Sequence, residues 1–349
     1  MARLASADVV DEDGDAGPLR PLRPTTVTAR RQQLRMWASA LALSGTDPAT
    51  LRSLADLVTL AAFRQALAFL DGRGDTQAGA VGTAMLSLAR HRLGVAGRAF
   101  EAIRRLVKAR KRPRHGMAPR AQRTIELLKS PGRRRAVLTL PQRTAASVAR
   151  RPGAPVADAL RVQSALALEL LIQTALRIGN VAAIELGRHL RFVRSGAHAT
   201  AHLTFEAHEV KNGTALAFEL PAATVTLLET YLRDHRGHLV ESGSSFLFPG
   251  RGDRPKKTSR LSAQVSRLVD DATGVSLTAH HFRHLAAVMT LEHDPTNYEG
   301  ARQLLGHRTL KTTVAYYAGE ERAAHVRRYD ALVERERTAA AEPRRGRRA

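Results

Sequence analysis

The stretch TAHHFRHLAAVMTLEHDPTNYEGARQLLGHRTLKTTVAYYAG, residues 278–319, carries most of the information about fold and chemistry in this chain. Histidine, arginine and tyrosine recur in it at spacings that apolar packing does not require. His280 and Arg283 lie three residues apart, so they share one face if the segment is helical. The first half of the stretch therefore predicts a helix that presents an imidazole and a guanidinium together.

The second half of the stretch predicts a short helix after a glycine turn. Gly306 ends the Leu304-Leu305 run, and His307 follows in the turn. Thr309 is a suitable N-cap for a helix that carries Tyr316. Two consecutive tyrosines point in different directions on a helix, so at most one of the pair 316–317 reaches a given site.

A strand pair is predicted upstream of this stretch. AHLTFEAHEV (201–210) alternates apolar and polar residues, TALAFELP (214–221) does so again, and Asn212-Gly213 lies between them. The pattern predicts a β-hairpin with a tight turn. Lys211 is expected at its tip, where an ammonium group can enter a groove, although a lysine beside a turn is most often only solvated.

The rest of the chain suggests two folded domains between two tails. Residues 1–24 and 338–349 lack apolar periodicity and are expected to be disordered. Apolar residues recur every three or four positions in 25–130, which predicts an all-helical domain. Residues 131–337, after a basic turn-rich segment, predict a mainly α domain with a small β-sheet, an α+β arrangement.

The charge of the 349 residues favours a polyanionic partner. There are 55 Lys and Arg against 32 Asp and Glu, a formal net charge of +23, and double-stranded DNA is the leading candidate. The first domain ends in a basic run, which either contacts phosphates or is a solvated loop; its members are Arg104, Arg105, Lys108, Arg110, Lys111, Arg112 and Arg114.

Several classes of protein are disfavoured by composition. The most apolar stretch, 165–176, is too short to cross a bilayer, and the acidic N-terminus lacks the apolar segment of a secretory signal. With no cysteine, thiolate nucleophiles, thiolate zinc sites and disulfides are excluded. We expect no membrane partner, and a soluble cytoplasmic protein associated with the nucleoid.

These residue types suit phosphoryl transfer. A phosphodiester attacked by an oxygen nucleophile gains negative charge, and guanidinium groups stabilise that charge with paired donors. Without a metal, the departing oxygen needs a proton from a lysine or histidine, and a phenol is a reasonable nucleophile. The reaction therefore needs two arginines, a lysine, one or two histidines and a tyrosine.

The order of these residues resembles the catalytic signature of the tyrosine recombinase, or phage integrase, family. The first arginine falls in TALRIGNVAAIEL, a lysine follows in the hairpin, and His-x-x-Arg, Leu-Gly-His and a tyrosine nine residues later complete the set. The residues that match are Arg177, Lys211, His280, Arg283, His307 and Tyr316. The resemblance covers about residues 137–337, whereas the N-terminal part matches only as a generic basic, helical DNA-binding domain.

The resemblance implies roles for these residues. Tyr316 forms a 3′-phosphotyrosine bond and leaves a free 5′-hydroxyl, with no cofactor, metal or ATP. The two arginines clamp the scissile phosphate, Lys211 is the general acid, His280 assists proton transfer and His307 hydrogen-bonds a phosphate oxygen. Two positions depart from the family pattern: Asn180 stands where an acidic residue is common, and Ala175 where glycine is common.

Other readings stay open at this point. His280 and His284 have the spacing of a helical metal pair, but no third ligand accompanies them.

The chain is expected to be a site-specific recombinase of a mobile element, acting in integration, excision or transposition. The alternatives are a type IB topoisomerase-like relaxing enzyme and a non-catalytic DNA-binding regulator. Ala323, Val326, Tyr329, Leu332 and Val333 share one helical stripe. That stripe is either a local core or a contact between subunits of a homotetramer on DNA, with host or element-encoded accessory proteins as possible partners.

Overall fold

The chain divides into two compact units, Met1–Pro113 and Arg114–Ala349. The computed structural model describes residues 24–74, 77–110, 117–195, 198–240, 243–317, 329–330 and 332–335. The two expected tails lie outside these residues, apart from Pro24, which begins the first helix. No described helix is long and apolar enough to span a membrane.

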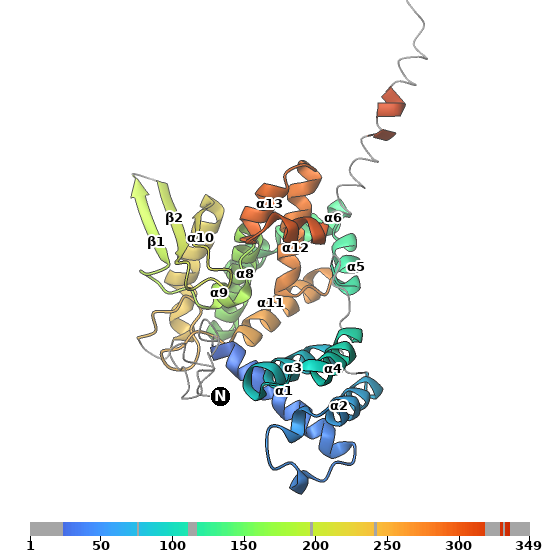
Figure 1. The fold of residues 1–349 in the computed structure, drawn as a ribbon. Coiled ribbons are helices and arrows are strands. Elements are labelled where there is room, and N and C mark those ends of the chain that lie inside the picture. Colours follow the sequence, from blue (N-terminus) through green and yellow to red (C-terminus); the bar gives the residue numbers. More distant parts are fainter. Residues whose placement is uncertain are drawn as a thin grey trace, which may run out of the picture. The chain divides into compact units, whose positions relative to one another are not determined.

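The described part of the first unit is helical, as the apolar spacing predicts. Trp37 and Phe63 meet edge to face at its centre with ring centroids 4.8 Å apart, and the Trp37 indole donates to the Leu57 carbonyl at 2.8 Å. Thr59 caps the second helix by accepting from the Ala62 amide. The elements are α1 (Pro24–Leu43), η2 (Pro48–Thr50), η3 (Asp56–Val58), α2 (Leu60–Gly72), α3 (Ala78–Leu93) and α4 (Gly97–Ala109) (Figure 1).

The second unit is mainly α with one small sheet, which confirms the expected fold class. Its helices before the sheet are α5 (Pro119–Leu127), α6 (Pro131–Leu138), α7 (Leu140–Arg150), α8 (Pro155–Thr174) and α9 (Ile178–Ala182). After the sheet come α10 (Ala222–Thr230), the π-helical turn η4 (Tyr231–His235), η5 (Arg236–Leu239), α11 (Thr258–Thr273), α12 (Ala279–His293) and α13 (Tyr298–Leu305). A further helix covers 310–317, and the described residues 329–330 and 332–335 are also helical.

The division between the units falls earlier in the chain than the boundary expected at 130/131. Helix α5 packs against α12, and both Ile125 and Leu128 are 1 % exposed in the core of the second unit. The turn-rich segment around residue 130 therefore lies inside the second unit. Local turn chemistry marks the end of a helix there, but it carries no information about which core the helix joins.

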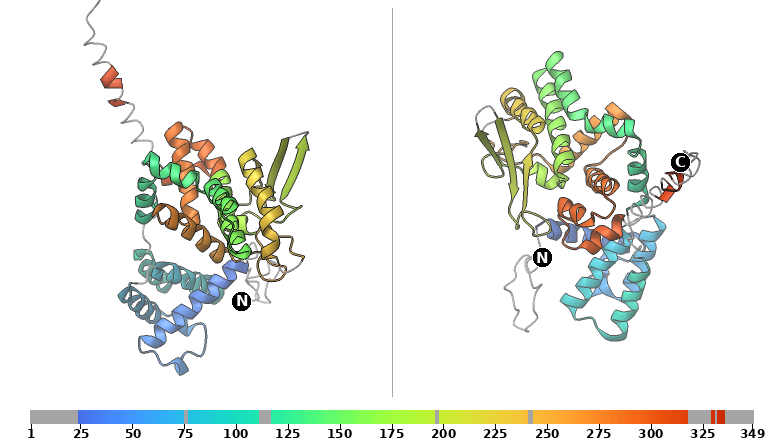
Figure 2. Two further views of the ribbon diagram at one scale, coloured as in Figure 1. Left: turned by 180° about the vertical axis from the view of Figure 1, so that it is seen from behind. Right: turned by 90° about the horizontal axis from the view of Figure 1, so that it is seen from above.

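Helix α8 is the central element of the second unit. It packs against α10 on one side and against α11 and α12 on the other (Figures 1 and 2). Leu166, Leu168 and Leu171 are each fully buried although they point in different directions, so the middle of this helix, residues 162–171, is enclosed on all sides. The helix ends at Thr174 with Ala175 as its C-cap, and this fixed end determines where the following residues lie.

The sheet has three antiparallel strands in the order β1-β2-β3. They are β1 (Leu190–Ser195), β2 (His198–Phe205) and β3 (Leu216–Leu220). The predicted pairing of the last two is confirmed, with Ala201 opposite Leu220 and Phe205 opposite Leu216. Strand β1 is an addition to the predicted pair.

The predicted tight turn between β2 and β3 is wrong. Strand β2 ends at Phe205 and a longer loop follows, because two of the next residues are held by the body of the unit. Val210 is 1 % exposed in the core, and the Glu209 carboxylate contacts His189 at 3.0 Å and Arg188 at 2.5 Å. The loop is therefore anchored at residues 209–210, immediately before Lys211.

Candidate active site

Arg283 lies at the centre of the candidate site and holds two helix ends together. It belongs to α12, which Thr278 begins with a capping box. Its side chain is 5 % exposed and donates to the Ala175 carbonyl at the end of α8 and, at 2.5 Å, to the Leu305 carbonyl at the end of α13. Burial, with the charge of Arg177 added, lowers the pKa of Arg283 to about 10.

Arg177 lies beside Arg283 and is held by a neutral group. It precedes α9, and its guanidinium donates to Oδ1 of Asn212 at 3.2 Å. Partial burial lowers the pKa of Arg177. Among the described residues, neither Arg177 nor Arg283 forms an ion pair with a carboxylate. The two positive charges therefore remain available to an anion.

Two histidines from the signature flank the arginines. His280 is exposed on one side, and its ring lies 4.7 Å from that of His284; burial of the other side, then the charge of Arg283, lowers its pKa. His307 is half-buried, and its Nδ1 lies 3.0 Å from the Thr313 hydroxyl. Burial, followed by the charges of Arg283 and Arg177, lowers the pKa of His307 to about 4. Both rings are therefore neutral at pH 7.

The helix over residues 310–317 carries both tyrosines and separates their roles. Tyr317 is 2 % exposed, its hydroxyl lies 2.8 Å from Nδ1 of His284, and burial raises its pKa. Tyr316 is half-buried, with its ring centroid 6.2 Å from that of His284. No hydrogen bond to the Tyr316 hydroxyl is found in the described part of the chain. The expected helix is present from residue 310, and its closing Gly319 lies outside the described residues.

Lys211 differs most from its expected placement. It is exposed in the anchored loop rather than at the tip of a two-residue turn. Its neighbour Asn212 accepts from Arg177 and donates to the Gly306 carbonyl, so the backbone of Lys211 lies close to the arginines. The structure thus brings five of the six predicted side chains into one cluster and places the sixth on a loop that borders it.

Sequence reasoning missed some residues that organise this site. Asn212 was seen only as a turn residue, because its two partners are distant in the sequence. His284 was considered as half of a metal pair, yet it bonds the phenol of Tyr317. The sequence did contain a signal for His284. It follows His280 by one helical turn and therefore faces the same side of α12 as that candidate site residue.

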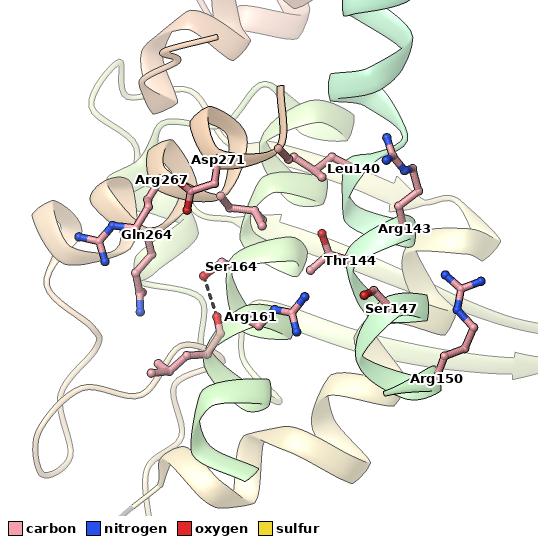
Figure 3. Close-up of a pocket in the computed structure, with 13 residues that line it drawn as sticks. Leu140, Arg143, Thr144, Ser147, Arg150, Arg161, Ser164, Gln264, Arg267 and Asp271 are labelled. Carbon is pink, nitrogen blue, oxygen red and sulfur yellow. Dashed lines mark hydrogen bonds between the residues drawn. The ribbon is translucent and has the colours of Figure 1, made fainter. Parts of the chain in front are cut away.

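An open groove of the second unit lies elsewhere. It measures about 700 Å³, is bordered by α7, α8 and α11, and contains none of the six candidate residues (Figure 3). Figure 3 shows the Thr144 and Ser147 hydroxyls on its α7 wall and Arg161 directed toward that wall. Among the described residues no group of three or more His, Asp or Glu side chains is arranged to hold a metal ion.

The chain is similar to known proteins in sequence and in fold. Residues 149–322 match the model of the phage integrase family. Tyrosine recombinase XerC of Mycobacterium tuberculosis (strain ATCC 25177 / H37Ra) is 29% identical over 265 residues, 75% of this chain and 79% of that protein. XerC of Mycobacterium leprae (strain TN) is 29% identical over 204 residues, 57% of this chain and 61% of that protein.

Two solved structures are also similar. The XerH recombinase bound to a palindromic difH substrate has a TM-score of 0.45 and 14% identity, with 91% of this chain and 99% of that chain covered. The lambda integrase tetramer bound to a Holliday junction has a TM-score of 0.42 and 16% identity, with 82% of each chain covered. On the family match and the XerC relatives, the chain belongs to the phage integrase family, the tyrosine recombinases, which are DNA strand-transferring enzymes that need no metal.

Proposed function

We propose that this chain carries out site-specific recombination of a mobile element through a 3′-phosphotyrosine bond made by Tyr316. Integration, excision and transposition all use this reaction. The observation that carries the proposal is the pair of guanidiniums, Arg177 and Arg283, bonded only to neutral acceptors in the described chain and lying beside the helix that bears Tyr316.

The charge of the cluster suits a phosphodiester. A carboxylate partner would cancel a guanidinium, whereas the carbonyl and amide acceptors here orient it and leave its charge intact. Burial is the main cause of the lowered pKa values of Arg283, His280 and His307, and the positive charge of a neighbouring guanidinium lowers each of them further. An anion bound among them relieves that repulsion.

The proton transfers follow from the neutral histidines and the lysine. The Tyr316 oxygen attacks phosphorus, the bond from phosphorus to the 5′-oxygen breaks, and Lys211 gives the 5′-oxygen its proton. His280, neutral at pH 7, accepts the phenolic proton. His307 Nδ1 lies 3.0 Å from the Thr313 hydroxyl, and in the tautomer in which that hydroxyl donates, the ring proton lies on Nε2 and can be donated to a phosphate oxygen. Rejoining reverses each transfer.

Tyr316 is favoured over Tyr317 as the nucleophile because of their surroundings. The Tyr317 phenol is buried against His284, and its raised pKa opposes formation of a phenolate. Tyr316 is only partly buried, and we propose that its hydroxyl is the one that a phosphate approaches. Tyr317 instead fixes the position of the helix, together with the bond from Thr313 to His307.

Double-stranded DNA is the proposed partner, and a tetramer the proposed assembly. In the basic run of the first unit, Arg104 and Arg110 pair with Glu101 and Asp71. Of the described members of that run, the exposed Arg105 and Lys108 of α4 are therefore the ones proposed to contact phosphates. In the C-terminal stripe, Tyr329 is 66% exposed and Leu332 is 52% exposed, while Ala323 and Val326 lie outside the described residues. These exposed apolar side chains are available to a neighbouring subunit.

A nicked suicide substrate tests the nucleophile directly. Cleavage next to a nick releases a short oligonucleotide, so the covalent adduct accumulates and is counted on a denaturing gel. Tyr316→Phe is expected to abolish the adduct and to leave DNA affinity within about threefold, because the phenol contributes little to phosphate binding. Tyr317→Phe, the matched control, is expected to keep the adduct.

Two results contradict the proposal. Loss of the adduct in Tyr317→Phe alone reassigns the nucleophile. A wild-type protein that binds the substrate tightly and forms no adduct is a DNA-binding protein without this chemistry.

A further inference from the structure

Asn212 joins two segments that are far apart in the sequence. Its Oδ1 accepts from the Arg177 guanidinium at 3.2 Å, and its Nδ2 donates to the Gly306 carbonyl, immediately before His307. We name these two hydrogen bonds the Asn212 bridge. Arg283 makes a similar connection between the same two segments. It donates to the Ala175 carbonyl, two residues before Arg177, and to the Leu305 carbonyl, one residue before Gly306.

The two arginines differ in how firmly the protein holds their guanidinium groups. Arg283 is 5 % exposed, and both of its terminal amino groups donate to backbone carbonyls. Arg177 is only half-buried, and its described side-chain bond is the one to Asn212. The direction of the Arg177 guanidinium therefore depends on a single neutral acceptor.

We propose that Asn212 is a positioning residue for the reaction, which aims the Arg177 guanidinium at the scissile phosphate and ties that arginine to the turn carrying His307. An amide suits this place because it accepts from a cation on one side and donates to a carbonyl on the other, without a charge of its own. An aspartate cannot donate to Gly306, and it cancels one of the two charges that the phosphate needs. This role rests on the proposed function of the cluster.

Asn180 provides a matched control. It is also a half-buried asparagine, it lies on α9 directly after Arg177, and its described hydrogen bonds are made by its backbone. Asn212→Ala is expected to lower the single-turnover rate of adduct formation about 10- to 100-fold, as expected when a group that stabilises the transition state is misaligned by about 1 Å. Asn180→Ala is expected to stay within about threefold of the wild type. DNA affinity is expected to change less than threefold in both.

A substrate with sulfur in place of the 5′-bridging oxygen separates positioning of Arg177 from an effect on Lys211. A thiolate leaves without a proton, so this substrate is expected to restore the rate of Lys211→Ala. Asn212→Ala is expected to remain slow on it, because its defect is in charge stabilisation at phosphorus rather than in protonation of the leaving group. A variant that had simply lost structure would fail to bind DNA as well.

Three outcomes overturn the inference. An unchanged rate of adduct formation in Asn212→Ala refutes the positioning role of Asn212. The proposed function is unaffected by that result as long as the wild type forms the adduct. Restoration of Asn212→Ala by the sulfur substrate assigns Asn212 to Lys211 instead of Arg177. Equal losses in Asn180→Ala and Asn212→Ala show that neither bond of the Asn212 bridge is specific. Absence of any adduct in the wild type, by contrast, refutes the proposed function itself.

Discussion

The end of helix α8 stores backbone strain that a single glycine substitution can measure. Ala175 has φ 48° and ψ 26°, and it is the one non-glycine residue with positive φ in the described chain. The left-handed conformation costs an L-residue about 1–2 kcal/mol relative to glycine. Glycine has no Cβ and adopts this conformation without that cost, so the strain at residue 175 comes from the alanine side chain.

Ala175→Gly is expected to be close to neutral for stability. It relieves about 1–2 kcal/mol of strain, but it also removes a fully buried methyl group worth about 0.8 kcal/mol and adds about 0.4–1 kcal/mol of freedom to the unfolded chain. Ala167→Gly, in the interior of α8, has the last two costs without the relief, because Ala167 is also fully buried. The difference between the two variants is therefore about 1–2 kcal/mol.

Calorimetric unfolding of the full chain measures this difference. For a unit of this size, about 1–2 kcal/mol corresponds to a gap of about 2–8 °C in Tm, with Ala175→Gly the more stable variant. The Ala175 carbonyl that accepts from Arg283 is kept in glycine, so adduct formation is expected within about threefold of the wild type. Equal Tm values for the two glycine variants refute the claim that strain is stored at residue 175.

Two other expected results concern pH and salt. Burial lowers the pKa of His284 to about 4, so below about pH 6.5 the unfolded chain binds more protons than the folded one. The contribution of His284 to stability is therefore complete above that pH. The free energy of unfolding falls by an amount on the order of 3 kcal/mol as the pH drops to about 4. Urea unfolding at pH 7 and pH 4.5 checks this, with a flatter response expected for His284→Gln; a wild type equally stable at both pH values contradicts it. DNA affinity is expected to fall about 10³-fold or more between low and moderate salt, because phosphate contacts release counterions. Titrations with labelled DNA measure this, and an affinity that does not depend on salt would refute binding through phosphate contacts.

The fold class and the members of the candidate site follow from local sequence because each has a local signature. Apolar periodicity marks the buried helices, alternation marks β2 and β3, and the ordered spacing of residues from 280 to 316 marks the cluster. Strand β1 escaped this reasoning: Arg191 is exposed, and Phe192 and Val193 are also partly or largely exposed, so the strand lacks the alternation of a half-buried strand. Its existence depends on pairing with β2.

The features that sequence reasoning missed depend on contacts between distant residues. The predicted tight turn failed because Glu209 bonds His189 and Val210 enters the core, and alternation alone cannot show that a strand has ended. Asn212 and Tyr317 were overlooked as organising residues for the same reason. Their partners, Gly306 and His284, are recognisable only after the chain has folded.

Arg283 has a structural role as well as its proposed role at the phosphate, and this affects how its variants are interpreted. Its guanidinium caps the carboxyl-terminal ends of α8 and α13, where unpaired carbonyls and the helix dipoles attract a cation. Removing it therefore leaves two buried carbonyls without a donor, and inactivity in such a variant reports loss of architecture as much as loss of chemistry. If Tyr316 is the nucleophile that we propose, a descendant without strand transfer could lose that tyrosine, whereas the fold would still require this arginine.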